Sequence, residues 1–425
     1  MHLLTLDLSA SPAQIATWLI TAAVVLGIIV RPWGLPEALW ATLGAAALPL
    51  FSLLPAADVC SAVRNGSNVY WFLAGMMLLA ELARRHGLFR WLAAYAVIRA
   101  RGSAVRLFTL IYAVGILVTM FLSNDATAVV LTPAVYAATR AAGARPMPHL
   151  YICAFIANAA SFVLPISNPA NLVVYGRHLP ALGAWLSQFG AASAGSILAT
   201  YLVLRFTQRA GLLGPIACDI ELPPLPPAGR IAAGGIAVTA VVLLAASALD
   251  RPLGFPTLLA AAATWAAILC LQPESPWRVL RSISWSILPL VAGLFVLVRG
   301  IEQTGILAPL ARLLRASGAA SPHAGAMLAA GGAALASNAV NNLPLGLVAG
   351  SVAQGAHLSA QITGALLLGV DLGPNLSVTG SLATILWLLA LRREGLKVSA
   401  WRFLLLGAIV MPPALIAALA ALLAR

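Results

Sequence analysis

The sequence predicts an all-α integral membrane protein with two internally duplicated halves, each containing a re-entrant hairpin and a broken transmembrane helix. Three observations lead to this fold class. Of the 425 residues, 61% are apolar and only 9% are charged. The apolar residues form many runs of about 17 to 25 residues, the length that crosses a bilayer as a helix. A set of short motifs also occurs twice along the chain, as in membrane proteins built from internal repeats.

The candidate membrane segments are rich in alanine and leucine. They are too long for the strands of a membrane barrel, which alternate over about 10 residues. Helices are therefore expected over roughly residues 15–31, 37–54, 69–84, 104–122, 149–177, 183–205, 231–248, 255–271, 284–300, 322–336, 361–391 and 401–423. The stretches 88–99 and 306–316 are amphipathic and are the ones most suited to lie flat.

The duplicated motifs lie about half a chain apart. They occur first at Ala74, Gly75, Gly87, Ser123, Asn124, Pro169 and Asn171, and again at Ala292, Gly293, Gly305, Ser337, Asn338, Pro374 and Asn375. The matching alanines, Ser-Asn pairs and prolines have similar separations, each close to half the length of the chain. We therefore expect an N-terminal transmembrane repeat over 1–205, a proline-rich connecting loop over 206–230, and a C-terminal repeat over 231–425.

Two apolar stretches in each half contain residues that a lipid-facing helix excludes. The first, 121–133, is matched by 335–350; each is too short for two crossings, which predicts a re-entrant hairpin whose backbone is sheltered by protein or water. The second, 164–176, is matched by 370–387, and its prolines should unwind the helix near mid-membrane. The half-helix ends left there can bind polar solutes or ions without any formal charge.

Amide and hydroxyl side chains gather in these interruptions. An amide supplies a donor and an acceptor together, which suits a site that dehydrates a polar solute. The alternative interpretation is that these side chains cap the broken helices and join them to neighbouring helices. The predicted solute-binding residues are Ser123, Asn124, Asn168, Asn171, Ser337, Asn338, Asn375 and Thr379.

Each half also contributes one acidic residue to an interruption, Asp125 in the first and Asp371 in the second. Acidic residues within a membrane are unfavourable and mark ion or proton paths. Because desolvation favours the neutral carboxyl, both are predicted to couple transport to protons. Asp125 is favoured because it adjoins the tip of a hairpin, while Asp371 has the alternative role of orienting residues 373–375.

The charge pattern excludes several protein classes. The net charge of +13 is almost wholly arginine in short loops between apolar segments, with Lys397 the only lysine. This pattern favours a positive-inside membrane orientation over nucleic-acid binding. No GxxxxGK[ST] motif is present, which argues against an enzyme or an ATP-driven pump. The cysteines are scattered along the chain, at Cys60, Cys153, Cys218 and Cys270. They predict neither a disulfide framework nor a metal site, and no cofactor is expected.

Four motifs together resemble the ArsB-type branch of the ion transporter superfamily, the arsenical pump membrane proteins. They are SNDATAVVLTP (123–133), NAASFVLPISNPANLVVYG (158–176), SNAVNNLP (337–344) and GVDLGPNLSVTGSLATILW (369–387), of which the last is the most specific. The resemblance covers nearly the whole chain. It implies efflux of arsenite or antimonite across the cell inner membrane, driven by protons, with a cytoplasmic ATPase subunit as an optional partner and a homodimer permitted.

The sequence departs from this family at two places. Asn158 and Asn375 stand where many arsenite carriers have Asp and Lys, so the site here is more neutral. A neutral site suits arsenite, which is an uncharged trihydroxide at neutral pH. The alternative is a sodium-coupled symporter of organic or inorganic anions, because the Ser-Asn motif is shared with divalent-anion symporters. A channel is a weaker alternative, since duplicated hairpins and broken helices are typical of carriers.

Overall fold

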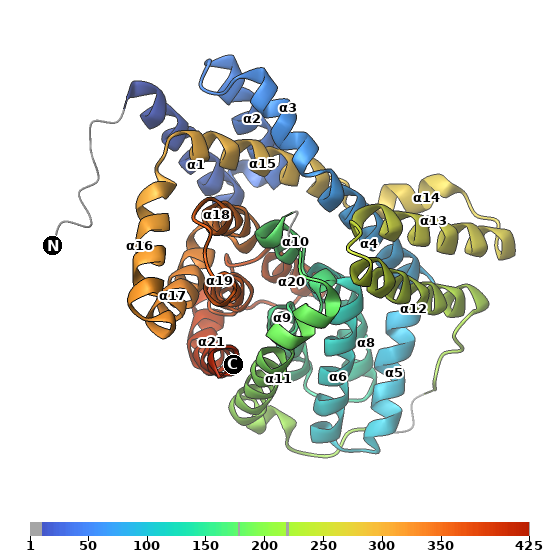
Figure 1. Ribbon diagram of the computed structural model, residues 1–425. Coiled ribbons are helices and arrows are strands. Elements are labelled where there is room, and N and C mark those ends of the chain that lie inside the picture. Colours follow the sequence, from blue (N-terminus) through green and yellow to red (C-terminus); the bar gives the residue numbers. More distant parts are fainter. Residues whose placement is uncertain (1–10, 177–178, 218–220, 425) are drawn as a thin grey trace.

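A computed structural model of the chain describes residues 11–176, 179–217 and 221–424 (Figure 1). These residues fold as helices and loops without any extended strand, which confirms the all-α class. Cys218 and the first ten residues lie outside the described part. In the view of Figure 1, α10, α18, α19 and α20 lie near the centre and the remaining helices surround them.

The first half of the chain forms a series of helices, the last of which ends at Thr207, inside the stretch 206–230 that the sequence predicts as a connecting loop. That stretch also contains a short helix, Arg209–Leu212, and the first residues of the helix Pro227–Ala248. The helices of the first half are α1 Pro12–Val30, η1 Pro32–Gly34, α2 Glu37–Leu50, α3 Ala56–Asn65, α4 Ser67–Arg85, α5 Leu88–Ala100, α6 Ala104–Leu122, α7 Asn124–Ala126, the π-helical turn η2 Thr127–Leu131, α8 Thr132–Ala141, α9 Pro146–Ala159, η3 Pro165–Ser167, α10 Pro169–Tyr175 and α11 Leu182–Thr207.

The second half repeats much of this order. Its helices are η4 Arg209–Leu212, α12 Pro227–Ala248, α13 Gly254–Leu271, α14 Pro276–Ser282, α15 Ile287–Gln303, α16 Leu307–Ala320, α17 Pro322–Val340, α18 Asn342–Gly355, α19 Ala360–Leu372, η5 Gly373–Asn375, α20 Leu382–Arg393 and α21 Ala400–Leu423. Helices α6 and α17 have the same length. The number of residues from the start of α6 to the start of α17 equals the number from the start of α11 to the start of α21.

Several described helices have the length and composition needed to cross a membrane. Six qualify on their own: α1, α6, α11, α12, α13 and α21. Helices α14 and α15 form a further candidate span that is bent by 45°. The amphipathic stretches 88–99 and 306–316 form separate helices, α5 and α16.

Helices from the two halves pack against each other in matching pairs, α4 on α13 and α15 on α2. At the first crossing, a Cβ added to Gly75 would lie 2.8 Å from the backbone of Thr257. At the second, a Cβ added to Gly293 would lie 2.7 Å from the backbone of Ala41. Small residues allow membrane helices to approach closely, so the repeated Ala-Gly motif serves helix packing.

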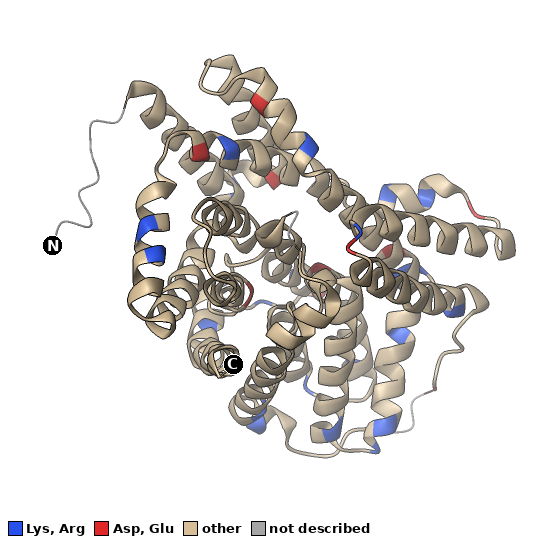
Figure 2. Cartoon of the chain, in the orientation of Figure 1, with Lys and Arg blue, Asp and Glu red and all other residues tan. Residues whose placement is uncertain are grey.

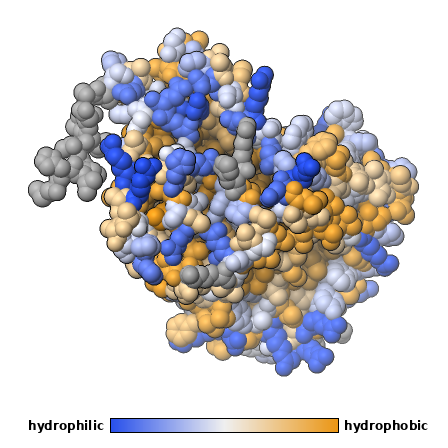
Figure 3. Space-filling model, in the orientation of Figure 1, coloured by the Kyte–Doolittle hydropathy of each residue, from blue (hydrophilic) through white to orange (hydrophobic). Residues whose placement is uncertain are grey.

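The surface agrees with a membrane location. Broad apolar areas separate clusters of hydrophilic residues in Figure 3, and the Lys and Arg residues in Figure 2 lie mainly at helix ends and in loops. Two ion pairs lie in the last turns of matching helices, Glu81 with Arg84 at 2.6 Å on α4 and Glu302 with Arg299 at 3.2 Å on α15. In the matching positions the order of acid and base is reversed.

Candidate functional site

The two hairpins bend at residues with unusual backbone angles. Ser123 joins α6 to α7 with φ 130° and ψ 164°, and Asn341 joins α17 to α18 with φ 73° and ψ 152°. Such angles are rare outside glycine, cost about 1–3 kcal/mol and cluster at functional sites. The second bend therefore lies at Asn341, directly after α17 as Ser123 lies directly after α6, and not at the Ser-Asn pair. Ser337 and Asn338 remain inside the last turn of α17.

Helices that begin next to these interruptions are capped by a polar side chain, which accepts a hydrogen bond from a backbone N–H of the first turn. The cap donors and acceptors are Ala126 N–H to Ser123 Oγ at 3.4 Å, Ala170 N–H to Asn168 Oδ1 at 3.0 Å, Leu343 N–H to Asn341 Oδ1 at 3.4 Å and Thr384 N–H to Ser381 Oγ at 3.2 Å. The capping role considered from the sequence is thus present at Ser123 and Asn168.

The broken helix of each half packs against the hairpin of the other half. After its break, the first half continues as α10, which contacts α18; after its break, the second half continues as α20, which contacts α7, η2 and α8. Both hairpins and both breaks therefore meet in one region. Sequence reasoning predicted these four interruptions, but their interleaving is visible only in the tertiary structure (Figure 1).

Buried amides join the two breaks directly. Asn168 Nδ2 donates to Asp371 Oδ1 at 2.8 Å, and Asn158 Nδ2 donates to Asn375 Oδ1 at 3.0 Å. Asn375 Nδ2 in turn donates to the carbonyl of Phe155 at 3.2 Å. Asn158, Asp371 and Asn375 are completely buried and Asn168 is nearly so. Asn158, which departs from the family pattern, therefore contacts a predicted site residue and joins the candidate site. Its place on the last turn before a break was the available signal.

Asn171 holds the unwound segment of the first half. Its Nδ2 donates to the carbonyls of Ser161 and Leu164 at 2.8 and 3.3 Å, and the side chain is completely buried. These two carbonyls belong to the segment between α9 and α10, which is not a continuous helix, and the Leu164 carbonyl also accepts from the N–H of Ser167 at 3.1 Å. The amide adds to the few backbone bonds of this segment, as expected for non-helical backbone at membrane depth.

The second break carries a cluster that is only partly buried: Asn338, Ser377 and Thr379. Asn338 Nδ2 donates to the carbonyl of Gly373 at 3.0 Å, and Asn338 Oδ1 accepts from Ser377 Oγ at 2.6 Å. Thr379 Oγ1 donates to the carbonyl of Asn338 at 2.8 Å. Sequence reasoning missed Ser377, although it lies two residues from Thr379 in the same unwound segment.

The two acids differ in exposure. Asp371 is completely buried, whereas Asp125 is partly exposed. Among the described residues, the Asp125 carboxylate makes no hydrogen bond or ion pair that the structure records. Its backbone N–H donates to Asn124 Oδ1 at 2.9 Å, so the buried Asn124 side chain folds back on its own backbone. Ser337 likewise bonds locally, donating to the carbonyl of Ala334 at 2.9 Å.

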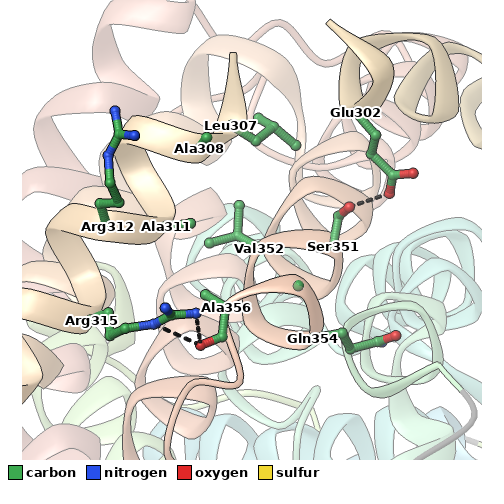
Figure 4. A pocket seen from close by; sticks show the side chains of 11 residues that line it. Glu302, Leu307, Ala308, Ala311, Arg312, Arg315, Ser351, Val352, Gln354 and Ala356 are labelled. Atoms are coloured by element: carbon green, nitrogen blue, oxygen red, sulfur yellow. Dashed lines mark hydrogen bonds between the residues drawn. The ribbon is translucent and has the colours of Figure 1, made fainter. Parts of the chain in front are cut away.

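A cavity of about 570 Å³ lies elsewhere, between α16, α18 and the end of α15 (Figure 4). Arg315 crosses toward α18 and donates to the carbonyl of Ala356 at 2.6 and 3.0 Å, and Ser351 donates to the carboxylate of Glu302. The residues predicted to bind the solute do not line this cavity. The amide and hydroxyl groups at the helix breaks therefore remain the candidate site.

Comparison with known proteins places these features in context. The sequence pattern of the citrate transporter family matches residues 16–370. The chain is 28% identical over 416 residues to the arsenical pump membrane protein of Escherichia coli, across 94% of this chain and 96% of that protein. It is 28% identical over 380 residues to the arsenical pump membrane protein of Yersinia enterocolitica, across 84% and 87%.

A solved structure has a similar fold. The YdaH transporter of Alcanivorax borkumensis superposes with a TM-score of 0.56 at 15% identity, across 86% of each chain. The resemblance indicated by the motifs is confirmed by the sequence matches, which span most of both chains, whereas the likeness to the solved structure concerns the fold. It also supports an all-helical membrane fold over nearly the whole chain.

Proposed function

Because this chain belongs to the citrate transporter family and is therefore a multi-pass membrane transporter and not an enzyme, we propose that it exports arsenite or antimonite in exchange for protons. The observation that carries the proposal is the 28% identity, across 94% of the chain, to a protein named as an arsenical pump. The proposed location is the cell inner membrane. An ATPase subunit and a second copy of the chain are proposed as optional partners.

The proposed solute site lies where both hairpins and both breaks meet. Its partly exposed groups are the amide of Asn338, the hydroxyls of Ser377 and Thr379, and the carboxyl of Asp125. Arsenite presents hydroxyl groups, which donate to and accept from amides and hydroxyls. Three buried amides of the predicted binding set would hold the unwound backbone in place: Asn168, Asn171 and Asn375. Its remaining members, Ser123, Asn124 and Ser337, would support the bends and the helix end beside the site.

Asp125 is the proposed proton carrier. Its carboxyl is partly exposed and carries no recorded partner, so it can gain and lose a proton without breaking an ion pair. It lies on α7, directly after the strained bend at Ser123 and against α20 of the other half. A change in its charge would therefore act on the contact between a hairpin and the opposite helix break.

The experiment measures arsenite uptake into everted membrane vesicles under an imposed pH gradient or an imposed sodium gradient. A pH gradient should accelerate uptake, and Asp125→Asn, which keeps the size but cannot carry the proton, should still bind arsenite and lose that acceleration. The matched substitution Asp371→Asn tests the second predicted acid. Full pH-driven transport by both variants would end the proton assignment.

The second candidate is a sodium-coupled symporter of organic or inorganic anions. The match to the citrate transporter family favours it, because that family is named for a carboxylate solute. Vesicles would then take up citrate or a related dicarboxylate under a sodium gradient, and cells with the protein would accumulate as much arsenite as cells without it. Arsenite resistance that disappears when the proton gradient is collapsed would exclude this candidate.

A further inference from the structure

The cavity between α16, α18 and the end of α15 has walls of two kinds (Figure 4). Leu307 and Val352 contribute apolar surface, whereas Glu302, Arg312 and Arg315 contribute charged groups. Its volume of about 570 Å³ lies within the range of about 300–1,000 Å³ that is usual for small-ligand pockets. A ligand with both a charged part and an apolar part matches such walls.

The lining of this cavity has an excess of positive charge. The carboxylate of Glu302 is already paired with Arg299, at 3.2 Å. Arg315 donates from Nε and Nη2 to the carbonyl of Ala356, which carries no formal charge. Among the described residues, no hydrogen bond or ion pair is recorded for the guanidinium of Arg312. Two guanidinium groups thus lack a carboxylate partner, and the cavity favours an anion.

The two arginines are placed to bind one anion together. They are three residues apart on α16, so they lie on the same face of that helix, one turn from each other. The bonds to Ala356 hold Arg315 against the end of α18 and leave its Nη1 without a recorded partner among the described residues. Guanidinium groups bind phosphate through paired N–H donors. A phosphate group is therefore the anion that suits this pair.

The charges around the cavity indicate that it lies at a membrane–water boundary. Asp58 on α3, Arg299 and Glu302 form a chain of ion pairs at the end of α15, with distances of 3.1 and 3.2 Å. Charged side chains are unfavourable in the hydrocarbon layer and gather where helices leave it. Helix α16 buries Leu314 and exposes Arg312, as an amphipathic helix at the interface does. The phosphates of phospholipids lie at the same depth.

We propose that this cavity binds a phosphate group supplied by an anionic phospholipid. The phosphate lies between Arg312 and Arg315, and the glycerol backbone lies against Leu307 and Val352. Basic pockets between transmembrane helices bind such headgroups in other membrane proteins. A choline headgroup also carries a phosphate, but its cation would lie close to the two arginines and weaken the attraction. A soluble anion would use the same guanidinium groups without the apolar wall.

Binding at this place would affect the second hairpin. Arg315 on α16 is bonded to the end of α18, the helix that forms the returning arm of that hairpin. A phospholipid held by Arg312 and Arg315 would add a second connection between α16 and α18. The position of this hairpin would then depend on the lipid composition of the membrane, which goes beyond the proposed export of a metalloid.

The test is lipid binding to the purified full-length chain in detergent, measured by native mass spectrometry during titration with phosphatidylglycerol or phosphatidylcholine. Phosphatidylglycerol should bind more tightly. Arg312→Gln should weaken that binding about tenfold, the effect of losing one charge-assisted pair. Arg278→Gln removes an exposed arginine of α14 that does not line the cavity, and it should leave the affinity unchanged. This control separates the cavity from general attraction to a basic protein.

Melting temperature provides a second measurement, because a ligand that binds only the folded chain stabilises it increasingly with concentration. Phosphatidylglycerol should raise the melting temperature of the wild-type chain more than that of Arg312→Gln. Equal affinity for the two lipids, or an unchanged affinity for phosphatidylglycerol in Arg312→Gln, would overturn the proposal. Stabilisation by inorganic phosphate without any by phosphatidylglycerol would assign the cavity to a soluble anion and would also overturn it. Neither measurement uses arsenite, so the lipid site can fail while metalloid export holds.

Discussion

Asn168 makes two separable contributions, and replacing it tests how the two halves are held together. Its Oδ1 caps α10 by accepting from Ala170, and its Nδ2 donates to Asp371 across the two breaks. Loss of a helix cap costs about 1 kcal/mol. Loss of a buried hydrogen bond to a charged group costs about 1.5–3 kcal/mol. Asn168→Ala should therefore lower the free energy of unfolding by about 3 kcal/mol.

Asn168→Ser separates the two terms, because a serine hydroxyl can cap α10 but is too short to replace the amide donor at Asp371. The serine variant should lose about 2 kcal/mol and the alanine variant about 1 kcal/mol more. The assay is reversible unfolding of the purified chain in mixed micelles, monitored by tryptophan fluorescence. A double-mutant cycle with Asp371→Asn then measures the coupling between the two side chains.

Two results would refute this reasoning. Equal stability of the serine and alanine variants would mean that the cap contributes nothing to α10. A coupling energy near zero in the double-mutant cycle would mean that the Asn168–Asp371 bond does not join the halves. Far-ultraviolet circular dichroism on each variant checks that the helices are intact before unfolding.

Further predictions concern packing, solute binding and acid stability. Gly75→Ala should lower the free energy of unfolding by about 1–3 kcal/mol because its Cβ would overlap the α13 backbone, whereas Gly190→Ala, which has open space around it, should be neutral or stabilising in the same unfolding assay. Thr379→Val should weaken arsenite binding by isothermal titration at unchanged melting temperature; unchanged affinity would remove Thr379 from the solute site. The hydrogen bond from Arg299 holds the pKa of Asp58 below its ordinary value of 3.8, so the pair stabilises the fold above that value and the contribution is lost as the pH falls through the folded pKa. Asp58→Asn should therefore flatten the acid limb of stability against pH, and an unchanged acid limb would contradict this.

At the strained bends, similar sequence motifs adopt different backbone structures in the two halves. The Ser-Asn pairs look alike in the two halves, but only Ser123 occupies a bend, while the matching bend is at Asn341. A helix end is set by the backbone geometry that the neighbouring helices permit, and both serine and asparagine can cap the helix that follows. The exact correspondence of α6 with α17, at both ends, is visible only once the helix ends are known.

The sequence by itself determined the helical class, the membrane location, the four interruptions and the polar residues within them. Each of these follows from local chemistry: long apolar runs need a bilayer, and proline and asparagine cannot be exposed to lipid within a continuous helix. The sequence also indicated the transporter relatives through motifs that lie within single segments.

Only the tertiary structure decided which polar groups face each other. Asn168 meets Asp371 across 203 residues, and Asn158 meets Asn375 across 217. These contacts depend on how α9, α10 and α19 pack, and long-range packing is not encoded in the spacing of residues along one helix. The acceptors of Asn171 and Asn375 were decided in the same way, because they are backbone carbonyls that only the folded chain brings within reach.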